Sequence, residues 1–300
     1  MLVDLKCPRE WSTGLTSFFQ ISRQTLPLIQ SSSDIYGHIH SGLLLSGVAI
    51  AGCLGDQQAA LVGQKCFKRG DAKNTYGTGC FMLYNTGETL IQSKHGLLTT
   101  MAYQFGDKAK PVYALEGAIS VAGSAVQWLR DSLKIIPDAV TASTLAENVP
   151  NSGDVYFVTA FNGLFAPYWR EDARGTIVGL TRYSTQAHIV RAALEATCFQ
   201  TRAILDVMNI ESGVRMRHLR VDGGMTQSDV TMQMQADLLG IPIHRPEMKE
   251  TTALGAAIAA GLAVGIWKDL TEVCEKVNST DFRVYEPSMS EKGNILSLKF

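Results

Sequence analysis

A mostly apolar run, residues 48–54, leads directly into Gly55, Asp56 and a stretch of helix-forming residues, 57–64. The apolar run predicts a strand, and the glycine followed by a carboxylate predicts a tight turn into a helix. In open α/β sheets such turns lie where ligands bind, because helix N-termini bring N–H donors and partial positive charge. We therefore expect Asp56 at the mouth of a sheet. The alternative is that its carboxylate only caps the following helix.

Composition predicts a globular protein with a large core. Of the 300 residues, 46% are hydrophobic and 18% charged, which is too apolar for a disordered chain and sufficient for one large domain or two smaller ones. The 27 basic and 28 acidic residues nearly cancel, and the basic residues are spread along the chain. We therefore expect no nucleic-acid partner and no attraction to an anionic membrane.

Cysteine usage and hydropathy predict a cytoplasmic protein. The six cysteines have no C-x-x-C spacing and no secretory signal precedes them, which is typical of a reducing compartment. The longest apolar runs, 43–54 and 253–267, are shorter than a membrane-spanning helix requires. The second run is mostly Ala and Gly and predicts a helix packed closely against a neighbour. No metal site is predicted, because the His38 and His40 pair lacks further ligands.

Residues 72–84 are β-rich on both sides of a Gly-Thr-Gly turn centred on Thr78. Glycines on both sides of a hydroxyl allow a sharp turn whose amide groups can approach an anion. This pattern favours a phosphate-binding hairpin. An ordinary hairpin turn fits the same residues.

A second segment, residues 117–133, follows a strand that we expect to end near Glu116. Its apolar spacing predicts a helix, and its small residues indicate that another helix or a ligand approaches the backbone closely. Gln127 lies one turn after Gly123 on the same face. From these residues alone, both positions have a structural explanation.

The third segment, residues 218–239, predicts a strand, a diglycine turn and a helix. A diglycine that opens a helix lets a nucleotide lie against the backbone at the helix N-terminus. The remaining chain predicts alternating strands and helices, so the expected class is α/β: a mixed sheet with antiparallel strands, flanked by helices. The other expected strands are 97–105, 112–116, 155–161 and 241–245, and the other expected helices are 15–22, 188–208 and 251–265.

Four motifs together resemble the glycerol kinases of the FGGY carbohydrate kinase family. They are residues 55–61 (GDQQAAL), 73–81 (KNTYGTGCF), 221–224 (VDGG), and 175–180 (GTIVGL) followed by 188–195 (HIVRAALE). Their order and spacing match that family over nearly the whole chain. The resemblance implies an actin-like, ribonuclease H-like ATPase lobe, the substrates glycerol and ATP, and Mg²⁺ as the accompanying cation.

The resemblance also implies roles for individual residues in glycerol binding and proton transfer. Asp56 matches the catalytic base, which holds a terminal hydroxyl of glycerol and takes its proton. Gln57 matches a neighbouring glycerol contact, and Phe81 matches an aromatic wall against the carbon skeleton.

On the nucleotide side, the resemblance implies that Thr78 meets the transferring phosphoryl group. Gly123, Gln127 and Gly224 match further nucleotide contacts. Glycerol kinases often carry Asn where this chain has Ser228, so the adenine contact at that position depends on a shorter side chain.

No D-x-G-T phosphate loop occurs in these 300 residues, although the family carries one in its N-terminal lobe. We therefore expect the chain to be a C-terminal-lobe fragment that is inactive alone. The expected division is a remnant of the N-terminal lobe in 1–45, the nucleotide-binding domain in 46–285 and a divergent tail in 286–300. The family's last helix is expected to be cut short after Phe282.

Three functions remain open from the sequence. The chain is part of an ATP:glycerol phosphotransferase, or a non-catalytic nucleotide-binding remnant, or part of a kinase for another polyol or a pentulose. The sequence is also compatible with a homo-oligomer.

Overall fold

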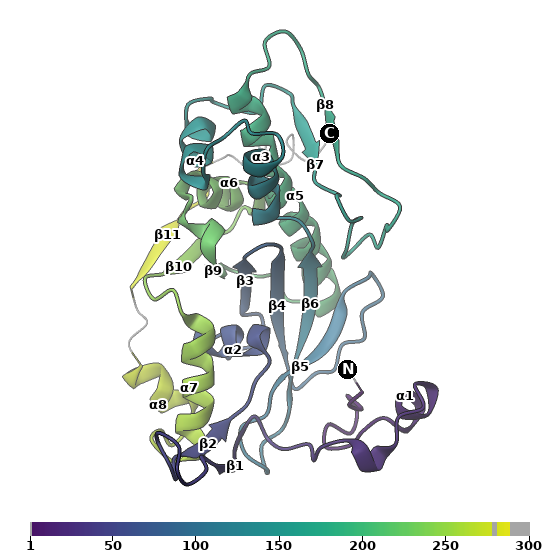
Figure 1. Cartoon of the computed structure of the whole chain (residues 1–300), viewed down its shortest axis with the longest axis vertical. Helices are drawn as coiled ribbons and strands as arrows, with labels where there is room; N and C mark the ends of the chain where they lie inside the picture. The colour runs from purple at the N-terminus through teal and green to yellow at the C-terminus, as the bar shows by residue number, and fades with distance from the viewer. Residues whose placement is uncertain (1, 278–280, 289–300) are drawn as a thin grey trace.

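The centre of the molecule is a seven-stranded mixed sheet (Figure 1). The computed structural model describes residues 2–277 and 281–288. The strands in spatial order are β11 (Phe282–Tyr285), β10 (Ile243–Pro246), β9 (Leu219–Asp222), β3 (Ala72–Tyr76), β4 (Cys80–Gly87), β6 (Val112–Ile119) and β5 (Leu98–Tyr103). The predicted class, a mixed sheet with antiparallel strands flanked by helices, is confirmed.

Two kinds of pairing meet at β3. On one side β3, β4, β6 and β5 are antiparallel neighbours, and on the other β3, β9 and β10 run parallel. Asn74 of β3 pairs with Val221 of β9. Because the two strands run in the same direction, the Gly-Thr-Gly turn after β3 and the diglycine after β9 leave the sheet at the same edge.

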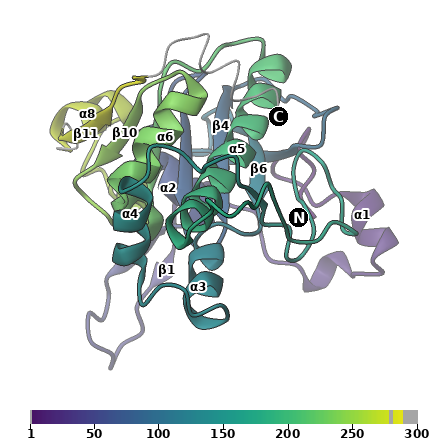
Figure 2. The same cartoon turned by 90° about the horizontal axis from the view of Figure 1, so that it is seen from above.

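Helices cover both faces of the sheet (Figures 1 and 2). One face packs its apolar side chains against α5 (Gln186–Ser212) and α6 (Asp229–Leu239). The opposite face packs against α2 (Asp56–Gly63), α7 (Thr251–Ala263) and α8 (Leu270–Lys276). Within the described ranges, no helix is both long and apolar enough to cross a membrane.

The packing of α2 on α7 is unusually close, as the Ala- and Gly-rich run predicted. A Cβ on Gly63 would lie 1.8 Å from the carbonyl oxygen of Thr251, and a Cβ on Gly255 would lie 1.8 Å from that of Ala59. Each helix therefore needs a glycine where the backbone of the other approaches. This contact fixes the position of α2 on the sheet.

A third group of elements lies beyond the edge where β3 and β9 end. It contains α3 (Gly123–Asp131), α4 (Ala139–Glu147) and the short antiparallel strands β7 (Tyr156–Val158) and β8 (Thr176–Val178). Apolar side chains of these elements pack against the first half of α5. Figure 1 shows α3 and α4 above the ends of β3 and β4.

The N-terminal part differs from one expectation. The predicted strand in 48–54 exists as β2 (Ala49–Gly52), but it pairs only with β1 (Ser33–His38) in a separate two-stranded sheet. Ile50 is half exposed, so the apolar run does not mark a strand of the central sheet. Asp56 therefore does not follow a strand of that sheet, and α2 brings it there instead. The chain begins with α1 (Thr13–Phe18) and the 3-10 turn η1 (Arg23–Thr25).

Two predicted boundaries are wrong. Strand β6 continues to Ile119, and α3 begins only at Gly123, because Gly117 still pairs with Met82 of β4. At the other end, residues from Phe282 form strand β11 against β10 rather than the end of a helix. Residues 289–300, most of the predicted tail, lie outside the described residues.

Candidate active site

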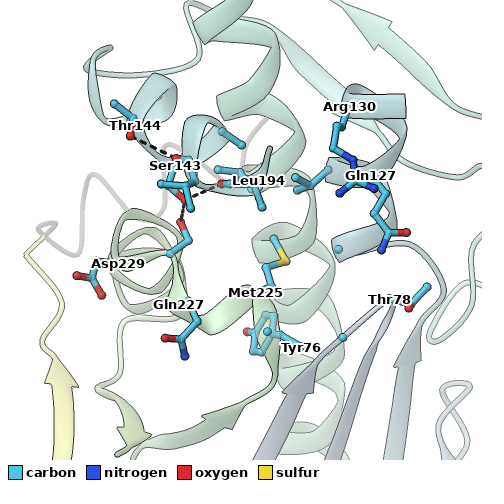
Figure 3. Close-up of a pocket in the computed structure, with 18 of the residues that line it drawn as sticks. Tyr76, Thr78, Gln127, Arg130, Ser143, Thr144, Leu194, Met225, Gln227 and Asp229 are labelled. Carbon is cyan, nitrogen blue, oxygen red and sulfur yellow. Dashed lines mark hydrogen bonds between the residues drawn. The ribbon is translucent and has the colours of Figure 1, made fainter. Parts of the chain in front are cut away.

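One cavity of about 490 Å³ is lined by all of the residues that the family resemblance assigned to the nucleotide (Figure 3). Its walls come from the β3–β4 turn, α3, α4, the 3-10 turn η2 (Gly224–Gln227) and the start of α6. This volume is in the range of small-molecule sites. The assigned residues on its wall are Thr78, Gly123, Gln127, Gly224 and Ser228.

The β3–β4 turn is bonded to the start of α3. The carbonyl oxygen of Thr78 accepts hydrogen bonds from the amide of Ala122 at 2.9 Å, and from the amide and hydroxyl of Ser124 at 3.1 and 2.9 Å. A Cβ on Gly79 would lie 2.2 Å from the Ile119 carbonyl oxygen, and one on Gly123 would lie 2.5 Å from that of Gly77. These glycines are therefore required by backbone packing, which leaves the exposed Thr78 side chain at the cavity.

The two glycines after β9 differ in what surrounds them. Gly223 has a φ of +95°, and a Cβ there would lie 2.4 Å from the Tyr76 carbonyl oxygen. Its identity is required by the fold. At Gly224 a Cβ would meet no protein atom within 4 Å, although the residue lines the cavity. The backbone at Gly224 therefore has open space beside it, so no protein contact requires a glycine there.

Ser228 is held by its own helix and by α4. Its side chain caps α6 by accepting from the Thr231 amide at 3.4 Å, and it is also hydrogen-bonded to the hydroxyls of Thr231 and Ser143, each at 2.8 Å. Three hydrogen bonds thus converge on one hydroxyl, and they use its two lone pairs and its single proton. Any ligand contact at this hydroxyl has to coexist with these bonds.

The rest of the cavity wall is apolar with a few charges at its margin. Tyr76, Met225 and Leu194 form part of the wall, and Gln127 and Thr78 lie on the same side of it in Figure 3. A mostly apolar wall with a few polar groups is typical of sites that bind small molecules.

Of the acidic groups at the cavity, Asp229 is already neutralised. Its carboxylate pairs with Arg283 at 2.7 Å and Arg245 at 3.2 Å and accepts from Tyr285. The negative charge of this side chain is therefore directed into protein contacts rather than towards a bound anion.

Asp56, Gln57 and Phe81 lie outside this cavity, in a second cluster on the α2 face of the sheet. Asp56 is exposed, and its carboxylate accepts from the backbone N–H of Gln57 at 2.8 Å and from the Gln57 side-chain amide at 3.3 Å. Gly55 occupies the N-cap position of α2. Asp56 is thus the first residue inside the helix and not its N-cap, but its carboxylate accepts one of the unpaired first-turn N–H groups, as the capping alternative expected.

A lysine to which the sequence assigned no role connects this cluster. The ammonium group of Lys73, a fully buried residue, donates to the Gln57 side-chain oxygen, to the Thr75 hydroxyl at 2.9 Å and to the Phe81 carbonyl oxygen at 3.2 Å. Burial lowers the pKa of Lys73 to about 8, against the opposing effect of carboxylates such as Asp222. The sequence held no local signal for this lysine, because a lysine in a strand normally points to solvent.

Two further carboxylates face Lys73 at longer range. Burial raises the pKa of Glu116 on β6, while the Lys73 charge acts in the opposite direction. Asp222 on β9 accepts from Gln64 at 2.9 Å and from Thr251 at 2.7 Å. The sheet face under α2 thus combines one buried cation with several carboxylates, an arrangement found more often in functional sites than in cores.

Comparison with known proteins decides the family. Residues 72–264 match the FGGY family of carbohydrate kinases, C-terminal domain. The chain belongs to this FGGY family. It is 55% identical to the glycerol kinase of Paenarthrobacter aurescens (strain TC1) over 280 residues, which are 93% of the chain and 55% of the relative. It is also 55% identical to that of Renibacterium salmoninarum over 299 residues, 58% of that protein.

Solved FGGY-type structures agree with the fold. Plasmodium falciparum glycerol kinase with ADP superposes with a TM-score of 0.92 at 41% identity, covering 99% of this chain and 59% of that one. A ligand-bound xylulose kinase from Lactobacillus acidophilus gives a TM-score of 0.83 at 22% identity, which indicates a shared fold only. This FGGY chain spans little more than half the length of the relatives it matches.

Proposed function

We propose that the polypeptide containing this chain transfers the γ-phosphoryl group of ATP to a terminal hydroxyl of glycerol. The observation that carries the proposal is the single cavity lined by Thr78, Gly123, Gln127, Gly224 and Ser228. The identity of 55% to two glycerol kinases supports glycerol as the acceptor. The ADP named for the Plasmodium falciparum structure supports an adenine nucleotide as the donor.

In the proposed reaction, a terminal oxygen of glycerol forms a bond to the γ-phosphorus while the bond to the β,γ-bridging oxygen breaks. ADP leaves, and the hydroxyl proton passes to the Asp56 carboxylate. Such transfers have a loose transition state with charge on the equatorial oxygens, so positioning and electrostatic stabilisation supply most of the catalysis. In this scheme Thr78 meets the phosphoryl group, Gln57 contacts glycerol, and Phe81 covers its carbon skeleton.

Mg²⁺ is proposed to accompany ATP. Magnesium in kinases is usually held by phosphate oxygens, water and only one or two carboxylates. Within the described ranges no group of three or more His, Cys, Asp or Glu side chains forms a metal-binding cluster. These residues by themselves do not make a resident magnesium site, so no step is assigned to the ion here.

The proposal is tested on the parent polypeptide, meaning the whole product of the reading frame that encodes these residues. Calorimetric titration with ATP and with glycerol measures binding, and a coupled assay measures ADP release in the presence of glycerol, a longer polyol or xylulose. We expect glycerol to give the highest kcat/KM. A higher value for the longer polyol or for xylulose would support the alternative, a kinase for another polyol or a pentulose.

The non-catalytic alternative has a different outcome in the same experiment. Binding of ATP without phosphorylation of any acceptor indicates a nucleotide-binding module, and binding of neither ligand indicates a remnant.

For the location we propose the cytoplasm, and the six cysteines, all of which are free thiols, support a reducing compartment.

A further inference from the structure

Among the residues that the structure describes, buried Lys73 has no contact ion pair, which is unusual for an ammonium group. Its side chain has no exposed surface, and its three hydrogen-bond partners are all neutral oxygens, on Gln57, Thr75 and Phe81. An ammonium has three donors and no acceptor, so these bonds use its whole capacity. A buried charge without an adjacent counter-charge costs free energy, which calls for an explanation in function.

The position of the ammonium group determines how the Gln57 amide is oriented. Because Lys73 can only donate, the oxygen of the Gln57 side chain has to face it. The amide NH₂ is then directed the other way, where it donates to Asp56 at 3.3 Å. A neutral acceptor in place of the ammonium would allow the amide to rotate and present its oxygen to the carboxylate.

The same ammonium joins α2 to the β3–β4 hairpin. Thr75 and Phe81 form a cross-strand pair in that hairpin, and Thr78 is at its turn. Since Lys73 bonds Thr75 and the Phe81 carbonyl as well as Gln57, it links the helix that carries Asp56 to the hairpin that carries Thr78.

We propose that Lys73 is a positioning residue that fixes the Gln57 amide and, through it, the Asp56 carboxylate relative to the β3–β4 hairpin. The inference rests on the proposed function and extends it, because it identifies Lys73 as the group that orients Gln57 and Asp56, the residues proposed to contact glycerol. Lys73 does not line the nucleotide cavity, so its effect falls on turnover and acceptor binding rather than on ATP.

The protonation of Lys73 makes the inference measurable. The ionisable groups around it are Asp56 on α2, Glu116 on β6, Asp222 on β9 and the Cys66 thiol after α2, while burial opposes its charge. With a pKa of about 8, the ammonium loses a donor as the pH rises from 7 to 9. The bond to the Gln57 oxygen then weakens, and the amide becomes free to rotate.

The first test follows the Gln57 side-chain NH₂ resonances of the chain by NMR between pH 6.5 and 9.5. We expect a step with a midpoint near pH 8 in the wild type and its loss in Lys73→Met. Lys65→Met is the matched control, because Lys65 lies after the other end of α2 and donates to the carbonyls of Val277 and Cys274. The step should persist in that variant.

The second test measures steady-state kinetics of the parent polypeptide. We expect Lys73→Met to lower kcat by about 10- to 100-fold while the KM for ATP changes less than about twofold, as for other supporting residues that orient a reacting group. The wild-type kcat should fall above about pH 8, and the variant should lack that limb. Lys73→Arg, which retains donors at all these pH values, should restore part of kcat without the limb.

The outcomes separate the two proposals. If wild type and variants all fail to phosphorylate glycerol, the proposed function fails, and the Gln57 NMR comparison still decides the role of Lys73. Gln57 NH₂ resonances or a kcat that Lys73→Met leaves unchanged overturn the positioning role, whereas a wild-type chain without a step near pH 8 contradicts only the lowered pKa of Lys73. Lys73→Arg, which retains the charge and the donors, decides the role if Lys73→Met does not fold.

Discussion

The hydroxyl of Ser143 donates a 2.8 Å hydrogen bond to the hydroxyl of Ser228, which joins α4 to the start of α6 at the cavity wall. Ser228 also caps α6, so one oxygen serves the helix, its neighbour and the cavity. The residue that lines the cavity at this point therefore also stabilises the fold, because it holds α4 and α6 together.

Ser228→Ala removes this cap and should lower the free energy of unfolding by about 1 kcal/mol. Ser228→Asn retains a capping side chain and should remain close to the wild type. Urea denaturation measures both, with Thr144→Ala as the control because the Thr144 hydroxyl donates to the Val140 carbonyl of its own helix. Equal stability of the Ala variant and the wild type would contradict the cap.

The two glycines of the diglycine should respond differently to alanine. Gly224→Ala should leave stability unchanged, because the added methyl group meets no protein atom, and should weaken ATP binding by about tenfold if the nucleotide lies against this part of the cavity wall. Gly223→Ala should lower stability by about 2 kcal/mol or more, because its φ of +95° and the Tyr76 backbone exclude a Cβ. Thermal unfolding and ATP titration are the measurements. Unchanged ATP affinity in Gly224→Ala would remove that residue from the nucleotide site.

Asp56→Asn in the parent polypeptide should reduce kcat by about 10²–10⁴-fold, because the amide cannot accept the glycerol proton. ATP affinity should change little, since Asp56 is not among the residues that line the cavity. Asp107→Asn is the control, an exposed carboxylate paired with Arg9 in the N-terminal region. Turnover equal to that of the wild type would exclude Asp56 as the base.

Gly255→Ala should lower the free energy of unfolding by about 2 kcal/mol or more, because the methyl group would overlap the Ala59 carbonyl of α2. Gly14→Ala in α1 has open space around its Cβ and should be neutral or slightly stabilising. Chemical denaturation of both variants checks this. A tolerated Gly255→Ala would mean that α2 and α7 can separate without cost.

Stability should rise with pH through the Lys73 titration. Its pKa is about 8 in the folded chain and about 10.4 in an unfolded one, so between these values the unfolded chain binds more protons. The free energy of unfolding therefore increases by up to about 3 kcal/mol from pH 8 to 10.5. Subtracting the free energy of unfolding of Lys73→Met from that of the wild type at each pH separates this contribution from those of tyrosines and cysteines. A difference that does not change with pH would contradict the lowered pKa of Lys73.

The sequence contained enough to predict the class of fold and to select residues that line one cavity. Glycine turns after strands are local features, so Thr78 and Gly224 could be found from spacing and resemblance. The pairing of β2 could not be predicted, because the same apolar run occurs both in two-stranded sheets and in central strands. The predicted end of β6, near Glu116, was too early because the pattern from Gly117 onwards predicted a helix. The glycine is required instead by the Ile204 side chain, which packs over β6.

Lys73 was overlooked because a lysine in a strand normally points to solvent. Its burial depends on α2, which lies over that face only because Gly63 and Gly255 let two backbones meet. The burial of Lys73 therefore results from packing between segments far apart in the sequence, and no local sequence pattern predicts it.

The hydrogen bonds that the Thr78 carbonyl accepts from Ala122 and Ser124 have a mechanical consequence. A hairpin tip anchored at one oxygen cannot move alone, so any displacement of the Thr78 turn has to carry the start of α3, and Gln127 with it. A ligand that displaced one of these two side chains would thereby shift both as one rigid unit.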